Sequence, residues 1–158
     1  DFRFSDLSGY RKIVDFKNLS SDNGLYNLST SLDFYNVTTG PAGAFTANET
    51  VRLVITRDDA SDLFTSYVDG VQQLSFTDTG ELGLFSGANS IIHFVIDDLA
   101  IGGEASAGVV DRIAIYDSAL STADVAALGG PTASVPEPGN ILAALGIIGV
   151  SLAGRRRR

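Results

Sequence analysis

The 158-residue sequence contains no cysteine, methionine or tryptophan, and its only histidine is His93. Without cysteine the chain can form neither a disulfide nor a thiolate metal site, and it has no cysteine nucleophile. A single histidine leaves little for histidine-based catalysis or for a histidine-rich metal site. Because residue 1 is Asp and methionine is absent, we expect the sequence to be a fragment or a processed form of a longer chain.

Basic residues are scarce as well, and the formal net charge is −8. Four of the 11 basic residues are the last four of the chain. The segment before residue 135 therefore contains the other 7 basic residues and 18 of the 19 acidic residues. Phosphate contacts need a basic face, so this acidic body excludes nucleic-acid binding. An acidic surface instead suits solubility, divalent cations or a salty exterior. The 44% apolar content is sufficient for a packed core.

The end of the chain has three parts. Residues 129–138 are small and proline-rich, which predicts a linker. Residues 139–154 are uncharged and mostly apolar, and four arginines follow: Arg155, Arg156, Arg157 and Arg158. An apolar helix partitions into a bilayer while an arginine cluster stays on the cytoplasmic side, so we expect a membrane-inserted helix with the acidic domain outside. The apolar part covers only ~23 Å of a ~30 Å hydrocarbon core, which favours a temporary anchor.

The order of these parts resembles the PEP-CTERM sorting signal: Val135, Pro136, Glu137 and Pro138, then the apolar stretch, then the terminal arginines. This resemblance implies an exported bacterial protein that an exosortase-type enzyme processes near the Pro-Glu-Pro motif. It also implies a final location at the cell surface or in an extracellular polysaccharide or biofilm matrix. An ordinary single-pass anchor with a proline-rich stalk is the alternative. A GPI signal does not fit, because its hydrophobic tail should end the chain without a cationic cluster.

The body of the chain shows short β-type runs about every ten residues. We expect strands at 12–16, 32–35, 51–56, 63–68, 71–76, 91–96 and 109–116. Glycine-rich turns separate them, and Asp69-Gly70 favours a type I′ hairpin. Even spacing of many short strands predicts an all-β sandwich. A helix is expected at 121–128, with Ser121 and Asp124 as a capping box and Gly129 just past its end.

Three segments resemble the laminin G-like, concanavalin A-like jelly rolls: Val51–Arg57, Ser66–Val71 and Gly108–Ser121. They match the patterns of a hydrophobic strand, of Tyr-x-Asp-Gly, and of Asp-x-Ile-x-Ile-Tyr followed by Leu-Ser. The resemblance implies a concanavalin A-like β-sandwich over residues 1–128, with an N-terminal strand missing. Residues 129–138 then form the linker with the Pro-Glu-Pro motif, and residues 139–158 the sorting helix with its arginine tail.

An acidic segment is the candidate metal site. Asp97 and Asp98 follow a predicted strand, and Glu104 lies in the glycine-rich loop after them. Clusters of hard oxygens on a flexible backbone suit Ca²⁺. The laminin G resemblance also implies a calcium ion at the rim of the sandwich. Adjacent strand residues point to opposite faces, so both aspartates can chelate only where the strand has ended. A solvated acidic loop is the alternative interpretation.

Sugar binding follows from the same resemblance, because the superfamily contains lectins. The candidates for stacking and hydrogen bonding are aromatic and amide side chains: Tyr10, Tyr26, Tyr35 and Tyr67, with Asn23 or Asn36. The Glu-x-Asp-x-(x)-Glu pattern of related glucanases is missing, and no nucleophile-elbow motif accompanies His93. We therefore expect a non-catalytic binding or structural module. A fragment of a carbohydrate-active enzyme and a plain adhesive domain are the alternatives.

Overall fold

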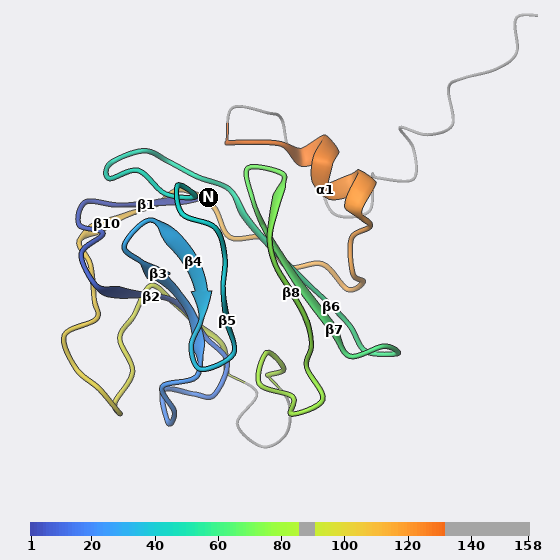
Figure 1. The fold of residues 1–158 in the computed structure, drawn as a ribbon, viewed down its shortest axis with the longest axis horizontal. Coiled ribbons are helices and arrows are strands. Elements are labelled where there is room, and N and C mark those ends of the chain that lie inside the picture. The colour runs from blue at the N-terminus through green and yellow to red at the C-terminus, as the bar shows by residue number, and fades with distance from the viewer. Residues whose placement is uncertain (86–90, 132–158) are drawn as a thin grey trace, which may run out of the picture.

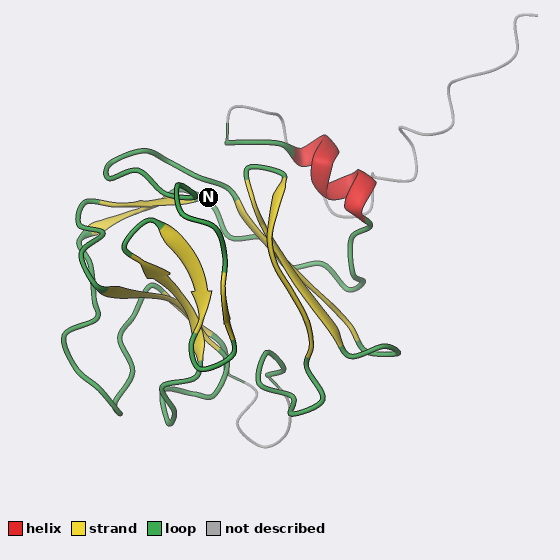
Figure 2. Ribbon diagram, viewed as in Figure 1, coloured by secondary structure: helices red, strands yellow, loops and turns green. Residues whose placement is uncertain are grey.

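A computed structural model describes residues 1–85 and 91–131 of the chain. The described strands are short and pair antiparallel, and both tight turns and longer loops connect them (Figures 1 and 2). The strands are β1 (Phe2–Phe4), β2 (Tyr10–Asp15), β3 (Gly24–Leu28), β4 (Ser31–Phe34), β5 (Thr38–Thr39), β6 (Leu53–Asp58), β7 (Leu63–Val68), β8 (Val71–Thr77), β9 (His93–Phe94) and β10 (Gly108–Val110). One helix, α1 (Thr122–Leu128), follows them.

Two sheets face one another across the core. One has five strands in the order β5-β4-β3-β2-β9, and the other has three in the order β6-β7-β8. Leu32 and Phe34 from β4 meet Phe64 from β7 and Phe76 from β8 in the hydrophobic core. The Phe34 ring contacts those of Phe16, Phe64 and Phe76 at 5.1–6.1 Å between centroids. The predicted β-sandwich is therefore confirmed.

The local elements with strong sequence signals form as expected. The strand predicted at 63–68 is β7, and Asp69 and Gly70 both have positive φ in the turn to β8, as a type I′ hairpin requires. Ser121 caps α1 and forms the capping box with Asp124, and Gly129 follows the helix at positive φ. Val125 and Leu128 are the buried residues of the helix, which packs beside Gly70. Helix α1 thus covers the hairpin end of the three-stranded sheet.

Two predicted strands are wrong in extent. The strand expected at 91–96 is only β9, and it ends before Val95, whose φ is +53°. The strand expected at 109–116 is reduced to β10, because its partner β1 is only three residues long. Beyond Val110, Ile113 and Ile115 are 52% and 64% exposed. An alternating pattern without a neighbouring ladder does not make a strand, since strand residues are stabilised by cross-strand pairs.

The predicted sorting motif, apolar helix and arginine cluster lie outside the described residues. Within residues 1–85 and 91–131, no helix is long and apolar enough to cross a membrane.

The phenylalanine cluster gives a first prediction. Replacing Phe34, which is 0% exposed, with Ala should lower the free energy of unfolding by about 3–5 kcal/mol through lost burial and a residual cavity. Val71→Ala is the control, because Val71 is 63% exposed and should cost little. Urea denaturation measures both variants, and equal losses would contradict this account of the core.

Candidate functional site

The five-stranded sheet has one face turned away from the core, and polar side chains gather there. Leu32 and Phe34 point into the core, so the alternation of a strand places Asp33 on the opposite face. Asp33 pairs with Tyr26 across β3 and β4, and Tyr26 pairs with Lys12 across β2 and β3. Cross-strand partners share a face, so these three side chains lie on the outer side of the sheet.

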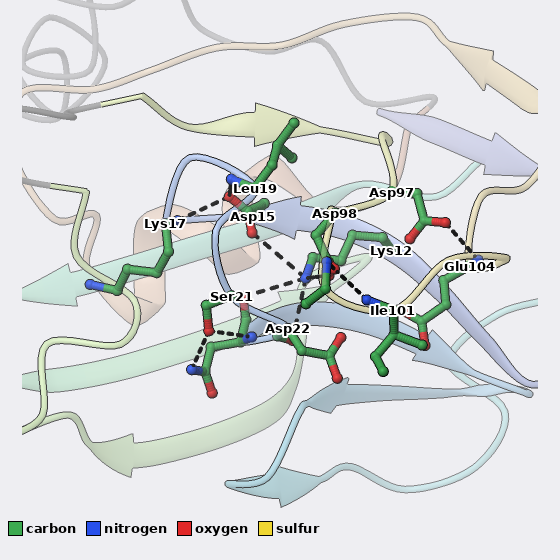
Figure 3. Close-up of polar contacts among 12 residues, drawn as sticks. Lys12, Asp15, Lys17, Leu19, Ser21, Asp22, Asp97, Asp98, Ile101 and Glu104 are labelled. Carbon is green, nitrogen blue, oxygen red and sulfur yellow. Dashed lines mark hydrogen bonds and ion pairs between the residues drawn. The ribbon is translucent and has the colours of Figure 1, made fainter.

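The ammonium of Lys12 is the centre of this face, and its side chain is 0% exposed. Five oxygen atoms surround it: Asp98 Oδ2 at 2.7 Å, Tyr26 Oη at 2.6 Å, the Asp22 carbonyl at 3.3 Å, the Asn23 carbonyl at 3.4 Å and Asp15 Oδ2 at 3.7 Å. The ammonium also lies 4.4 Å from the centroid of the Tyr26 ring. We call Lys12, Asp15, Asp22, Tyr26, Asp98 and Glu104 the Lys12 cluster. All of them except Tyr26 are labelled in Figure 3.

Asp98 is the main counter-ion of Lys12 and is 5% exposed. Its Oδ1 accepts hydrogen bonds from the backbone amides of Ala100 and Ile101, at 2.7 and 3.1 Å. Burial opposes ionisation of this carboxyl, but the Lys12 hydrogen bond and the two amides outweigh it and lower the pKa of Asp98 to about 2. Asp98 is therefore an ionised partner that holds both the ammonium and its own loop.

Two more carboxylates, those of Asp22 and Glu104, lie close to Asp98. Asp22 Oδ1 accepts a hydrogen bond from the Tyr26 hydroxyl at 2.7 Å. Burial, the bond to Asp22 and the charge of Glu104 raise the pKa of Tyr26, so its hydroxyl stays protonated. Burial and the neighbouring Asp22 raise the pKa of Glu104. The described cluster thus holds more negative groups than its single lysine can neutralise.

The structure brings together two of the three residues predicted for calcium. Carboxylate oxygens of Asp98 and Glu104 lie within 4.8 Å of each other and of Asp22, which the sequence did not single out. Asp97 is not a member of this group, because its Oδ2 accepts from the amides of Gly103 and Glu104 and so closes the loop. The expected divergence of Asp97 and Asp98 is therefore seen, although β9 ends before them.

The oxygens of this group are of the kind that Ca²⁺ prefers, but both oxygens of Asp98 are already engaged. Calcium takes six to eight oxygen ligands at 2.3–2.6 Å. Asp98 Oδ1 already accepts from two amides, and Asp98 Oδ2 lies within hydrogen-bonding distance of Lys12 and Tyr26. The Lys12 ammonium also stands among the carboxylates, where a cation would lie. The residues as arranged do not fit a calcium ion in addition to Lys12.

A second feature of the same face is an open depression of about 290 Å³ beside the Lys12 cluster. Tyr10, Asp33, Tyr35 and Asn36 line it, together with residues 37–39. The ring centroids of Tyr10 and Tyr35 are 5.6 Å apart. They lie 5.6 and 5.9 Å, respectively, from the ring centroid of the buried Tyr26. We call this the tyrosine depression. It combines two partly exposed aromatic rings with a carboxylate and an amide.

The other sugar candidates lie elsewhere. Tyr67 is buried on the three-stranded sheet, with its hydroxyl 3.5 Å from Thr122 of α1. Asn23 bonds Ser21 in the loop before β3. His93 Nε2 lies 3.1 Å from Asn18 Oδ1, a pairing that ties β9 to the loop after β2. Of the residues proposed from sequence for sugar binding, only Tyr10, Tyr35 and Asn36 meet at one surface.

A larger cavity, of about 410 Å³, lies between the sheets and under residues 112–120. Its lining is mainly apolar and includes Ile13, Ile55, Phe94 and Ile115. Binding sites normally place a few polar groups to orient a ligand within an apolar lining. Among its charged residues, Asp1 and Arg52 pair with each other, and Arg57 pairs with Asp59, Asp62 and Asp78, which lie outside the lining. We therefore place the candidate site at the tyrosine depression instead.

The two facing antiparallel sheets define an all-β sandwich with a polar outer face. The chain belongs to the concanavalin A-like lectin/glucanase superfamily, since the laminin G-type model of that superfamily matches residues 8–126. No curated protein and no solved structure matches the chain. The jelly-roll domain recognised from three sequence segments is thereby confirmed. The superfamily contains sugar-binding proteins and enzymes, so membership alone does not choose between them.

Sequence reasoning missed the lysine at the centre of the site. Lys12 and Asp98 are 86 positions apart, and the loop that carries Asp98 reaches β2 through the bond from Lys12 N to Glu104 O. One signal was available: Lys12 begins the predicted strand 12–16, in which Ile13, Val14 and Phe16 are apolar. A buried lysine needs an anionic partner, so a search for that partner would have pointed to the acidic loop.

The Lys12–Asp98 pair gives a second prediction. Asp98→Asn keeps the shape of the side chain but leaves the Lys12 ammonium without its nearest anion, so the free energy of unfolding at pH 7 should fall by about 3 kcal/mol. The folded-state pKa is below the ordinary 3.8, so the contribution of Asp98 is present above pH 3.8 and is lost as the pH falls towards about 2. The stability of the Asp98→Asn variant should therefore fall less between pH 3.8 and pH 2 than that of the wild type.

Urea denaturation at pH 7 and at a series of acidic pH values measures both effects. Asp117→Asn is the matched control, because Asp117 is exposed and bonds only its neighbour Ser118 among the described residues. Identical stability curves for the two variants would contradict a central role for the buried pair.

Proposed function

We propose that this chain is a non-catalytic carbohydrate-binding module of an exported surface or matrix protein, and that its sugar site is the tyrosine depression. The observation that carries the proposal is the meeting of Tyr10 and Tyr35 with Asp33 and Asn36 around one open hollow. Aromatic faces pack against the apolar side of a sugar ring, while carboxylate and amide groups bond its hydroxyls. Membership of a superfamily that includes lectins supports the same function.

The charge of the site favours a neutral polysaccharide. The lining of the tyrosine depression contains Asp33 and no lysine or arginine. The chain as a whole has a net charge of −8. Anionic polymers such as uronic-acid polysaccharides would be repelled by such a surface at low ionic strength. A neutral hexose polymer avoids this repulsion, and its hydroxyls can bond the exposed side chain of Asn36.

Binding without hydrolysis is the better-supported mode. Glycoside hydrolysis needs two carboxyl groups on either side of the scissile bond. Among the described residues, carboxylate oxygens of Asp22, Asp98 and Glu104 lie within 4.8 Å of one another. Asp98 bonds Lys12 and Asp22 bonds Tyr26, and none of the three lines the tyrosine depression. A carbohydrate-active enzyme is the competing function. Release of reducing sugars from a bound polysaccharide would establish it.

The export part of the proposal rests on the tail. The tail has the three parts of the PEP-CTERM signal in the same order: Val135–Pro138, the apolar residues 139–154 and Arg155–Arg158. The acidic domain would then lie outside, with the arginines on the cytoplasmic side until an exosortase-type enzyme cleaves the chain. Delivery to a polysaccharide matrix is consistent with a domain that binds sugar.

A third prediction tests the sugar site. Tyr35→Ala should weaken binding to a neutral polysaccharide by about tenfold, because it removes one of the two exposed ring faces. Affinity electrophoresis of the full chain in gels containing dextran, β-glucan or alginate measures the effect. Tyr116→Ala is the control, since Tyr116 lies outside the depression. Equal retardation of both variants, or tighter binding to alginate than to the neutral polymers, would refute the site, and no retardation at all would favour an adhesive protein domain.

A fourth prediction tests the sorting signal. Protein recovered from the outer surface of the native host should have an intact mass that lacks the residues after the Pro-Glu-Pro motif. Glu137→Ala or Pro138→Ala should leave the chain full-length and membrane-bound, while Thr132→Ala in the same linker should be processed normally. Normal processing of the Glu137 and Pro138 variants, or a full-length wild-type mass, would leave only a permanent single-pass anchor.

A further inference from the structure

The oxygens around the Lys12 ammonium are of the types found around a metal cation. Within 3.7 Å of Lys12 Nζ lie two carboxylate oxygens, two main-chain carbonyls and one hydroxyl, from Asp15, Asp98, Asp22, Asn23 and Tyr26. Hard cations such as Ca²⁺ are bound by this mixture of carboxylate and carbonyl oxygens. An ordinary buried ion pair needs only one carboxylate and one or two further acceptors.

An ammonium does not satisfy these oxygens completely. It has three protons, so it can donate three directed hydrogen bonds to the five oxygens around it. Asp15 is fully buried, yet its Oδ2 has no hydrogen-bond partner among the described residues. This oxygen lies 3.7 Å from Lys12 Nζ. Glu104 Oε2 is likewise enclosed without a hydrogen bond. Both orphan oxygens belong to the Lys12 cluster, and the Asp15 oxygen, which lies beside the ammonium, would be satisfied by a cation with more ligand positions.

We propose that Lys12 is a built-in replacement for a divalent cation: its ammonium fills a calcium-type site and thereby keeps calcium out. Lysine is suited to this role because its charge is a compact point on a flexible stem. The stem enters from β2, while the oxygens come from the end of β2, the loop before β3, β3 itself and the loop after β9. The ammonium therefore joins the same segments that a bound ion would join.

This arrangement has two consequences that a purely structural salt bridge does not have. The wild-type domain should be indifferent to calcium, since the position is taken by a group that cannot dissociate. Shortening the lysine should convert the same oxygens into a calcium site, because removing the ammonium leaves space and an uncompensated negative cluster. Lys12→Met should not do so, since the thioether chain fills the space that the stem occupied.

The experiment compares the full wild-type chain with Lys12→Ala, Lys12→Met and Lys17→Ala. Lys17 is the chain's only other lysine, and its ammonium contacts two backbone carbonyls and no carboxylate among the described residues. Thermal unfolding is followed in EDTA and in CaCl2. In addition, Tb³⁺ is titrated with excitation at the tyrosine band, because a lanthanide at this position would lie against the Tyr26 ring and be sensitised by it.

The expected result is specific to one variant. Lys12→Ala should be less stable than wild type in EDTA and should regain roughly 5 °C or more in calcium at about 100-fold over its Kd. It alone should show sensitised Tb³⁺ emission that calcium displaces. Wild type, Lys12→Met and Lys17→Ala should show the same Tm with and without calcium.

Other outcomes overturn the proposal. A calcium-dependent rise in Tm of the wild-type chain would show that the ammonium does not exclude the ion. A calcium response of Lys12→Met equal to that of Lys12→Ala would place the ion elsewhere. If Lys12→Ala is unfolded in EDTA, recovery of its folded spectrum in calcium supports the proposal, and failure to recover overturns it, as does a folded Lys12→Ala that binds neither Ca²⁺ nor Tb³⁺.

Discussion

The ion pair between Lys12 and Asp98 is the interaction on which the outer face of this domain depends. Both side chains are 0% exposed, so both charges have been taken out of water. That desolvation is costly, and it is offset only where further hydrogen bonds complete the surroundings of each charge. Two backbone amides donate hydrogen bonds to the Asp98 carboxylate. The Lys12 ammonium donates to the Tyr26 hydroxyl and to two backbone carbonyls. The loop after β9 has little regular structure, and this pair fixes it against the sheet.

Tyr26 connects the Lys12 cluster to the tyrosine depression. Its hydroxyl belongs to the Lys12 cluster, while its ring supports Tyr10 and Tyr35 at the tyrosine depression. A binding site gains affinity when its side chains are already held in the bound arrangement, because less conformational entropy is lost on association. In the proposed sugar site, the buried charges would thus contribute to recognition without touching the ligand. The two features are one continuous structure, with the ionic part beneath and beside the aromatic part.

Sequence patterns predicted what depends on neighbours along the chain. The Asp69-Gly70 hairpin and the Ser121–Asp124 capping box are local, and both are present. Asp98 and Glu104 were also predicted as one group, because they share a short loop. The Lys12 cluster was missed because its members meet only when β2, β3 and the loop after β9 are in register. The strand expected at 109–116 failed for a related reason, since periodicity specifies a strand's face but does not supply its partner.

A tethered ammonium and a bound calcium ion stabilise a fold in different ways. The contribution of a bound ion grows with its free concentration, so a calcium-dependent domain weakens wherever calcium is scarce. At a given pH, a lysine contributes the same amount whatever the calcium concentration, at the expense of poorer coordination, as the unpartnered Asp15 oxygen shows. If the module is exported, as proposed above, stability that does not depend on calcium is an advantage wherever the concentration of divalent ions varies. The Lys12 cluster then keeps more carboxylates than one ammonium can neutralise, because a lysine carries one positive charge and a calcium ion carries two.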